Sequence, residues 1–176
     1  MAVRFVPSLF LVLLLLVLTF VASHDVTQAQ GVALTVDSTA DAVDANPGDG
    51  ACDDGAGNCT LRAAIMEANA LAGADAITLP TGTYAISIAG TGEDAAETGD
   101  LDISDDLTIN GAGADTTIID GSGLDRVFHV PVGTVDIYGV SITNGSAGAG
   151  GGIFNSGTLT ITDSTVNGST SKDSGG

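Results

Sequence analysis

The feature that most constrains this chain is a repeat of 24 residues toward its C-terminal end. Residues 135–142 (VDIYGVSI) align with residues 159–166 (LTITDSTV) at a shift of 24 positions, and apolar residues coincide at 135/159, 137/161 and 142/166. Each copy runs on into an Asn-Gly pair. A period of this length, made of short strands and turns, indicates a solenoid, because one coil buries its apolar face only when the next coil stacks on it.

The rest of the chain after residue 75 has the same character. Short runs of alternating apolar and polar residues are separated by clusters of Gly, Asn, Asp, Ser and Thr, which is typical of strands joined by turns. These runs are residues 77–79, 84–88, 101–103, 107–109, 117–119, 127–130, 135–137, 140–142 and 159–161. We therefore predict an all-β domain over residues 76–176. The repeat stops where a further strand should begin, so we expect the chain to be truncated at its C-terminus or covered there by a partner.

The first residues have the pattern of an export signal. Arg4 precedes an apolar run at residues 9–22, and small residues at cleavage spacing follow before residue 29. The apolar run is shorter than the roughly 20 residues that a spanning helix needs, so the pattern favours a cleaved signal peptide over residues 1–29 rather than an uncleaved membrane anchor. We expect an extracellular or cell-surface protein.

Residues 31–75 predict a separate N-terminal region. It opens with a short strand at residues 32–36 and continues as a loop dense in Asp, Asn, Gly and Pro. A helix is predicted over residues 61–72, where one apolar stripe recurs at a spacing of three and four residues. Thr60 is the expected N-cap and Gly73 the expected stop. Because one short helix cannot bury its stripe alone, we expect it to cap an open end of the β domain.

Two candidate sites lie in the loop before this helix. Cys52 and Cys59 are close in sequence, which in an exported protein predicts a disulfide rather than a two-ligand metal site. Asp44, Asn46 and Asp49 are the candidate ligands for Ca²⁺, since hard oxygen ligands at turns suit that ion. Their spacing is not that of an EF-hand, so a solvated acidic loop without a cofactor is the favoured alternative.

Charge restricts the partners. The chain has 22 acidic side chains against four Lys and Arg, which disfavours binding to nucleic acid and to anionic membranes. Neutral glycans or other surface proteins fit this charge better.

Catalytic groups are sparse in the sequence. Arg62 on the predicted helix is one candidate base. The nearest approach to a constellation is Asp120, Asp125, Arg126 and His129, and we interpret these four as residues of turns and coil surfaces. Asp105 and Asp106 are adjacent, so on a strand they would point to opposite faces.

The segment CTLRAAI at residues 59–65 resembles the CSLREA motif of a group of exported bacterial proteins. The acidic stretch at residues 40–52 and the coils at 106–113 and 150–157 are similar to those of the same family. The resemblance implies a right-handed parallel β-helix of the pectate-lyase type with a short N-terminal capping α-helix. Ala63 stands where that motif has Glu, so the reciprocal half of the capping box is missing here.

These observations favour a non-enzymatic exported or cell-surface protein with a structural, adhesin-like or binding role. The alternative is the N-terminal part of a carbohydrate-active enzyme, a polysaccharide lyase or a glycoside hydrolase, whose catalytic coils lie beyond residue 176.

Overall fold

The computed structural model describes residues 30–172. The predicted signal peptide at residues 1–29 lies outside the described residues. Its assignment as a cleaved signal rather than a membrane anchor therefore stays a prediction. No helix within residues 30–172 is long and apolar enough to cross a membrane.

The described chain contains one helix and otherwise short strands. Strand β1 (Ala33–Thr35) comes first, an irregular acidic loop follows over residues 36–60, and helix α2 (Leu61–Ala70) comes next. The remaining strands are β2 (Asp75–Leu79), β3 (Gly82–Ala85), β4 (Leu101–Asp102), β5 (Leu107–Gly111), β6 (Thr117–Asp120), β7 (Phe128–Val130), β8 (Thr134–Tyr138), β9 (Ser141–Thr143), β10 (Ser146–Ala147), β11 (Ile153–Asn155), β12 (Thr158–Thr162), β13 (Thr165–Asn167) and β14 (Thr170–Ser171).

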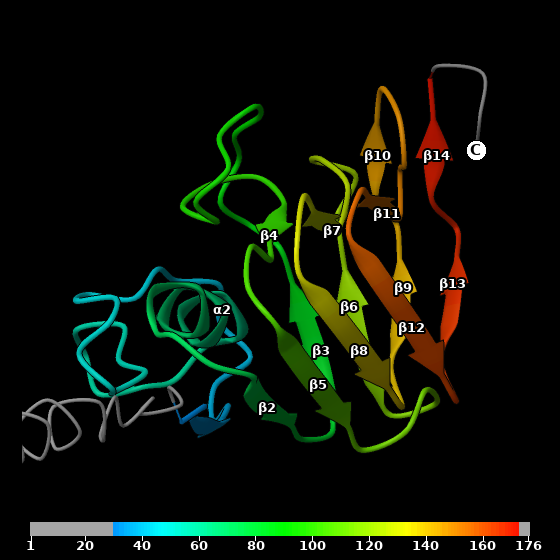
Figure 1. The fold of residues 1–176 in the computed structure, drawn as a ribbon. Coiled ribbons are helices and arrows are strands. Elements are labelled where there is room, and N and C mark those ends of the chain that lie inside the picture. The colour runs from blue at the N-terminus through cyan, green and yellow to red at the C-terminus, as the bar shows by residue number, and fades with distance from the viewer. Residues whose placement is uncertain (1–29, 173–176) are drawn as a thin grey trace, which may run out of the picture.

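Every strand pairing in the described residues is parallel. The strands form four sheets with the orders β1-β2-β5-β8-β12, β3-β6-β9-β13, β4-β7-β11 and β10-β14. From β2 onward, successive strands along the chain belong to different sheets, and each return to a sheet adds a strand farther from α2 (Figure 1). The fold is thus β-rich and parallel with one helix, which confirms the predicted class at that level.

The strand register confirms the repeat that the sequence predicts. In the pairing of β8 with β12, Val135 lies opposite Leu159 and Ile137 opposite Ile161, a shift of 24 residues. Ile142 lies opposite Val166 at the same shift. Earlier passages of the chain are longer, because the largest sheet advances by 32 residues from Asp75 to Leu107 and by 28 from Leu107 to Val135. The regular 24-residue period is therefore a property of the last passages only.

The core is a stack of apolar side chains that the register places in line. Ile77, Ile109 and Ile137 occupy matching positions of β2, β5 and β8, and all three are fully buried. Burying such a side chain stabilises a fold by about 1.5–3 kcal/mol. The next residue in line, Ile161, is 38% exposed because β12 is the last strand of its sheet.

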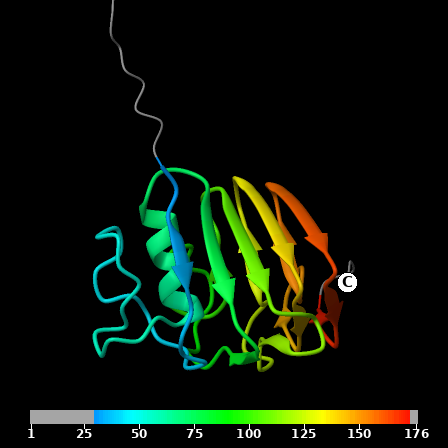
Figure 2. The ribbon, with the colours of Figure 1, turned by 90° about the horizontal axis from the view of Figure 1, so that it is seen from below.

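Helix α2 lies at one end of this stack, as predicted. Figures 1 and 2 both show it between the strands on one side and the acidic loop on the other. The helix ends at Ala70 rather than at the predicted residue 72, because the backbone of Leu71 is extended, with φ −96° and ψ 154°. The outer, polar face is buried too, which the single apolar stripe does not predict. All residues from Leu61 to Ala68 are buried, including Arg62 and Glu67.

Candidate functional site

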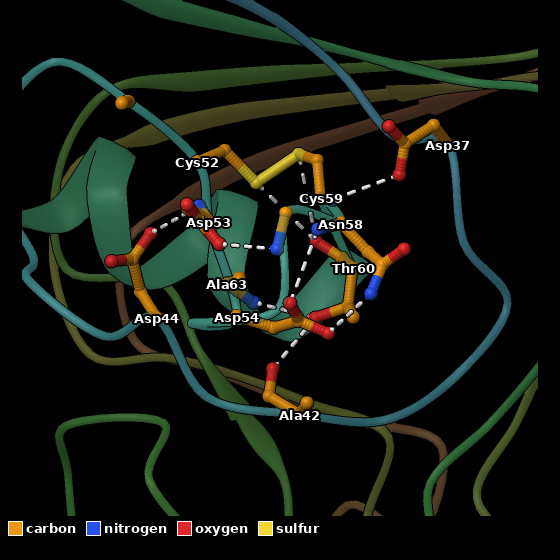
Figure 3. Close-up of a disulfide and its surroundings, with 12 residues drawn as sticks. Asp37, Ala42, Asp44, Cys52, Asp53, Asp54, Asn58, Cys59, Thr60 and Ala63 are labelled. Carbon is orange, nitrogen blue, oxygen red and sulfur yellow. Dashed lines mark hydrogen bonds between the residues drawn. A yellow bond between two sulfur atoms is a disulfide. The ribbon is translucent and has the colours of Figure 1, made fainter.

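The acidic loop is closed by the predicted disulfide between Cys52 and Cys59 (Figure 3). The two Cα atoms are 5.1 Å apart. The backbone N–H of Cys59 also donates to Oδ1 of Asp37 at 2.8 Å, so the residue just before the N-cap is held from two directions. The disulfide thereby fixes where the helix starts.

The N-cap is Thr60, as predicted. Its Oγ1 accepts a hydrogen bond from the Ala63 N–H at 3.1 Å and donates one to the Ala42 carbonyl at 2.6 Å (Figure 3). Thr60 is completely buried. The same hydroxyl therefore caps the helix and attaches the acidic loop to it.

The predicted calcium ligands are used by the loop itself. The Asp44 carboxylate is buried, and its oxygens accept hydrogen bonds from the N–H groups of Asn46 at 2.8 Å and Asp53 at 3.3 Å. Asp49 Oδ1 accepts a hydrogen bond from the Ala51 N–H at 2.9 Å. These bonds form turns in which the side chain stands in for a backbone acceptor. Calcium binding by Asp44, Asn46 and Asp49 stays a prediction.

Glu67 clamps the acidic loop to the outer face of the helix. Its two carboxylate oxygens accept hydrogen bonds from the N–H groups of Gly48 and Gly50. Both glycines have positive φ, 92° and 88°, a conformation that favours glycine and lets two nearby N–H groups reach one carboxylate. A side chain buried with this charge is stable only when it is hydrogen-bonded in such a way.

Arg62 is buried in the same unit and is fully occupied. Its Nε lies 2.6 Å from Oδ1 of Asp41, and its terminal nitrogens donate to the carbonyls of Ala96, Gly99 and Asp100 at 2.8, 2.9 and 3.3 Å. A guanidinium with no exposed surface cannot reach a substrate in this structure. Arg62 is therefore a structural residue in this fold.

The pKa of Asp41 reflects its ion pair with Arg62. Burial raises the pKa of its carboxyl, but the Arg62 hydrogen bond and the N–H groups of Ser87 and Ile88 outweigh burial, and the pKa lies below its ordinary value. The carboxylate accepts those two N–H groups at 2.7 and 2.9 Å. The ionised form is therefore the one the fold holds.

A second cluster of charged groups lies along the sheet of β4, β7 and β11. Asp102 on β4 is paired in register with His129 on β7, and Oδ1 of the aspartate lies 2.8 Å from Nδ1 of the imidazole. Asp94, on the loop before β4, places its Oδ1 3.6 Å from the same nitrogen. Asp94, Asp102 and His129 are the one set of three metal-ligating side chains that converge within the described residues.

Two further buried carboxylates lie in the same region as Asp94, Asp102 and His129. Asp100 and Asp125 are buried, and Nε of Arg126 lies 3.2 Å from Asp100 Oδ2 and 3.8 Å from Asp125 Oδ1. Burial and the charges of Asp102 and Asp125 raise the pKa of Asp100 to about 6, against the opposing effect of Arg126. Burial also raises the pKa of Asp102, although its hydrogen bond to His129 opposes the shift.

The predicted constellation of four residues is divided by the structure. Arg126 lies against Asp125 and Asp100, whereas His129 lies against Asp102. The guanidinium and the imidazole both contact the Phe154 ring, and the sequence did not single out Asp100 or Asp102. Asp120 lies apart, in an open groove of about 490 Å³ with Asn144, whose Nδ2 donates to the aspartate at 3.1 Å. The groove is lined by Asp120, Ser122, Gly123, Asn144, Gly145, Ser146, Gly168 and Thr170.

One signal in the sequence could have found the pairing of Asp102 with His129. The triplets at residues 101–103 and 128–130 are both apolar, polar and apolar, and the structure pairs their first residues, Leu101 and Phe128, in parallel register. Two polar residues at matching positions of adjacent parallel strands point to the same face. The shift of 27 residues, however, differs from the 24 of the visible repeat.

Comparison with models of known protein families, with curated proteins and with solved structures found no match for this chain.

Proposed function

We propose that this chain is a right-handed parallel β-helix with a capping helix at its N-terminal end, exported to the cell surface or beyond, with a non-enzymatic structural, adhesin-like or binding role. The observation that carries the proposal is the stack of parallel strands with α2 at one end, where the Arg62 and Glu67 side chains of the helix are engaged in internal contacts. The proposed membership of the CSLREA-motif group rests on the same segment.

The β-helix is supported by the connectivity. From β2 onward, strands that are neighbours in one sheet are separated along the chain by strands of the other sheets, and all pairings in the described residues are parallel. Such crossovers between parallel strands are right-handed in about 98% of cases, because a right-twisted strand packs back onto the sheet only in that sense.

The non-enzymatic role is supported by the state of the two arginines in the β domain and its cap. Arg62 is enclosed, and Arg126 is paired with Asp100 while its guanidinium carbon lies 5.2 Å from the centre of the Phe154 ring. A lyase of this fold type needs an Arg or Lys side chain that can reach the sugar and, in its neutral form, take a proton from it. Neither arginine meets that requirement in the described residues.

The groove around Asn144 fits a neutral partner. Its polar lining consists of hydroxyls, one amide and one carboxylate, and the chain's net charge of −18 repels acidic polymers. Neutral glycans or other surface proteins are therefore the partners we propose.

The test combines turnover and binding on the full chain. The purified protein is incubated with polygalacturonate and with neutral glucans and xylans, with and without Ca²⁺, and the products are followed as unsaturated uronides and new reducing ends. We expect no turnover on any of them, and retention only on the neutral polymers. Turnover that disappears in an Arg126→Met variant would overturn the proposal and favour the carbohydrate-active alternative.

A further inference from the structure

We propose that Asp94, Asp102 and His129 form a binding site for a divalent transition-metal ion of the Zn²⁺ type. This site is separate from the acidic loop that the sequence suggests for Ca²⁺, and it does not depend on the function proposed above. It joins the loop before β4, strand β4 and strand β7.

The distances suit a shared ion. Nδ1 of His129 lies 2.8 Å from Asp102 Oδ1 and 3.6 Å from Asp94 Oδ1, and all three ligand atoms lie within 4.8 Å of one another. Zinc binds imidazole nitrogen and carboxylate oxygen at about 2.0–2.2 Å in a tetrahedron, so ligand atoms around one ion lie about 3.3–3.6 Å apart. The distance from His129 Nδ1 to Asp94 Oδ1 already fits this range, and His129 Nδ1 and Asp102 Oδ1 must move slightly apart to admit the ion.

Two of the ligands are already fixed in position. The Asp102 side chain is completely buried, and its other oxygen accepts a hydrogen bond from the Ala96 N–H at 3.1 Å, which directs Oδ1 toward the imidazole. The His129 ring packs against the Phe154 ring of β11, with centroids 5.5 Å apart. Neighbouring groups that orient the ligands in this way are what metal sites require.

Asp94 leaves one side of the site open. Its side chain is 78% exposed, while that of His129 is 15% exposed. The loop that carries it is held by Glu93, whose carboxylate accepts hydrogen bonds from the N–H groups of Ala95 and Thr98. Three protein ligands with solvent on the fourth side is a common arrangement for zinc.

The surrounding charge favours a cation independently of the ligand geometry. Asp100 and Asp125 are both buried beside the set, and Arg126 is the cation that contacts them. Arg126 thus has two buried carboxylates beside it, and the Asp102 carboxylate is buried only two residues along the chain from Asp100. A bound divalent cation would offset charge that the fold otherwise keeps out of water at a cost.

The nitrogen ligand decides the class of metal. Ca²⁺ and Mg²⁺ prefer sites made wholly of oxygen, whereas imidazole together with carboxylates suits Zn²⁺ and its neighbours in the transition series. We therefore expect Zn²⁺ to bind more tightly than Ca²⁺ at this site.

The experiment is calorimetric titration of the full chain with Zn²⁺ and, separately, Ca²⁺, after treatment with a chelator. It uses a His24→Gln background, because His24 and His129 are the chain's two histidines. We expect one Zn²⁺ per chain, and a loss of affinity of about tenfold or more in Asp94→Asn and in His129→Gln. The ring-nitrogen NMR signal of His129 should shift on Zn²⁺ addition.

Glu97→Gln is the matched control, since Glu97 is exposed on the same loop and its replacement removes the same charge. It should leave Zn²⁺ affinity unchanged. Asp94→Asn is the decisive variant, because Asp94 is exposed and its replacement should not disturb the fold. The proposal is overturned by Zn²⁺ binding that is insensitive to Asp94→Asn and His129→Gln, by an equal loss in Glu97→Gln, or by no binding at all.

Discussion

Arg62 connects three segments of the N-terminal region, so its replacement by Met is the most informative perturbation of stability. Methionine fills similar volume but removes every hydrogen bond of the guanidinium. Oδ1 and Oδ2 of Asp41 would lose their cationic partner, and the carbonyls of Ala96, Gly99 and Asp100 would lose their donor. The variant therefore leaves a carboxylate that is nearly enclosed without its counter-charge.

The magnitude follows from the burial of both partners. Removing one member of a buried ion pair costs about 3–5 kcal/mol, because the other charge stays buried and uncompensated. The two N–H groups that Asp41 keeps, from Ser87 and Ile88, still satisfy part of its need. We expect Arg62→Met to lower the free energy of unfolding by about 4 kcal/mol, a large share of the 5–15 kcal/mol typical of a domain.

A double-variant cycle separates the ion pair from the other contacts. Asp41→Asn removes the charge of the partner, so the Arg62→Met and Asp41→Asn double variant should be more stable than the sum of the single losses implies, by about 1–3 kcal/mol. The stability loss that Arg62→Met still causes in the Asp41→Asn background measures the hydrogen bonds to the three carbonyls.

The assay is urea denaturation followed by far-ultraviolet circular dichroism, with the midpoint and slope compared between variants. Lys172→Met is the control, because Lys172 is exposed and its loss should change stability by less than about 0.5 kcal/mol. A loss below about 1 kcal/mol for Arg62→Met, or strict additivity with Asp41→Asn, would refute the reasoning.

Three further perturbations test other parts of the structure. Replacing Cys52 and Cys59 together by Ser should lower the free energy of unfolding by about 2 kcal/mol, since the disulfide closes only a short loop; a reductant should destabilise the parent protein and leave this variant unchanged. Thr60→Ala should cost about 1–2 kcal/mol in the same denaturation assay, because the N-cap bond to Ala63 is lost, whereas Thr60→Ser should restore most of it. Asp100→Asn tests pH dependence. Because the pKa of Asp100 in the folded protein, about 6, lies above the ordinary 3.8, its ionisation destabilises the fold as pH rises from about 4 to 6. The shift corresponds to at most about 3 kcal/mol, so in the presence of a chelator the stability of Asp100→Asn relative to the parent should rise from pH 4 to pH 7; a constant difference would contradict the assigned cause.

The strands of the core could be predicted because their signal is local. Alternation of apolar and polar residues specifies which side chains face inward, and Ile109 and Ile137 are buried as the pattern requires. The register of the last passages was predictable for a related reason, since the two copies have equal length and their apolar positions superimpose.

Two of the three two-residue strands carry no such signal. β10 and β14 contain two residues each, Ser146–Ala147 and Thr170–Ser171, which are too few to alternate. They are strands only because the repeat places them side by side, with Ser146 opposite Thr170. Stacking decides their structure, and the segments alone do not.

The buried polar groups of α2 were beyond prediction for a different reason. Arg62 and Glu67 lie on the face that an amphipathic pattern assigns to solvent. Arg62 is enclosed by Asp41 of the acidic loop and by the carbonyls of residues 96–100, and Glu67 reaches Gly48 and Gly50 of the acidic loop. A pattern along one helix holds no information about a loop that covers it.

The helix and the charged cluster are one hydrogen-bonded unit, although the sequence places them in different regions. Asn69 of α2 donates from Nδ2 to the Asp102 carbonyl at 2.8 Å. Arg62 binds the Ala96 carbonyl, and the Ala96 N–H binds the Asp102 side chain. The backbone and the carboxylate of Asp102 are therefore both positioned by contacts that begin on the helix. A capping helix that only shielded the end of the stack would need an apolar face and nothing more. The polar residues of α2 also hold the loop before β4 and strand β4, which carry Asp94 and Asp102. The capping helix therefore contributes to the geometry of the proposed metal site.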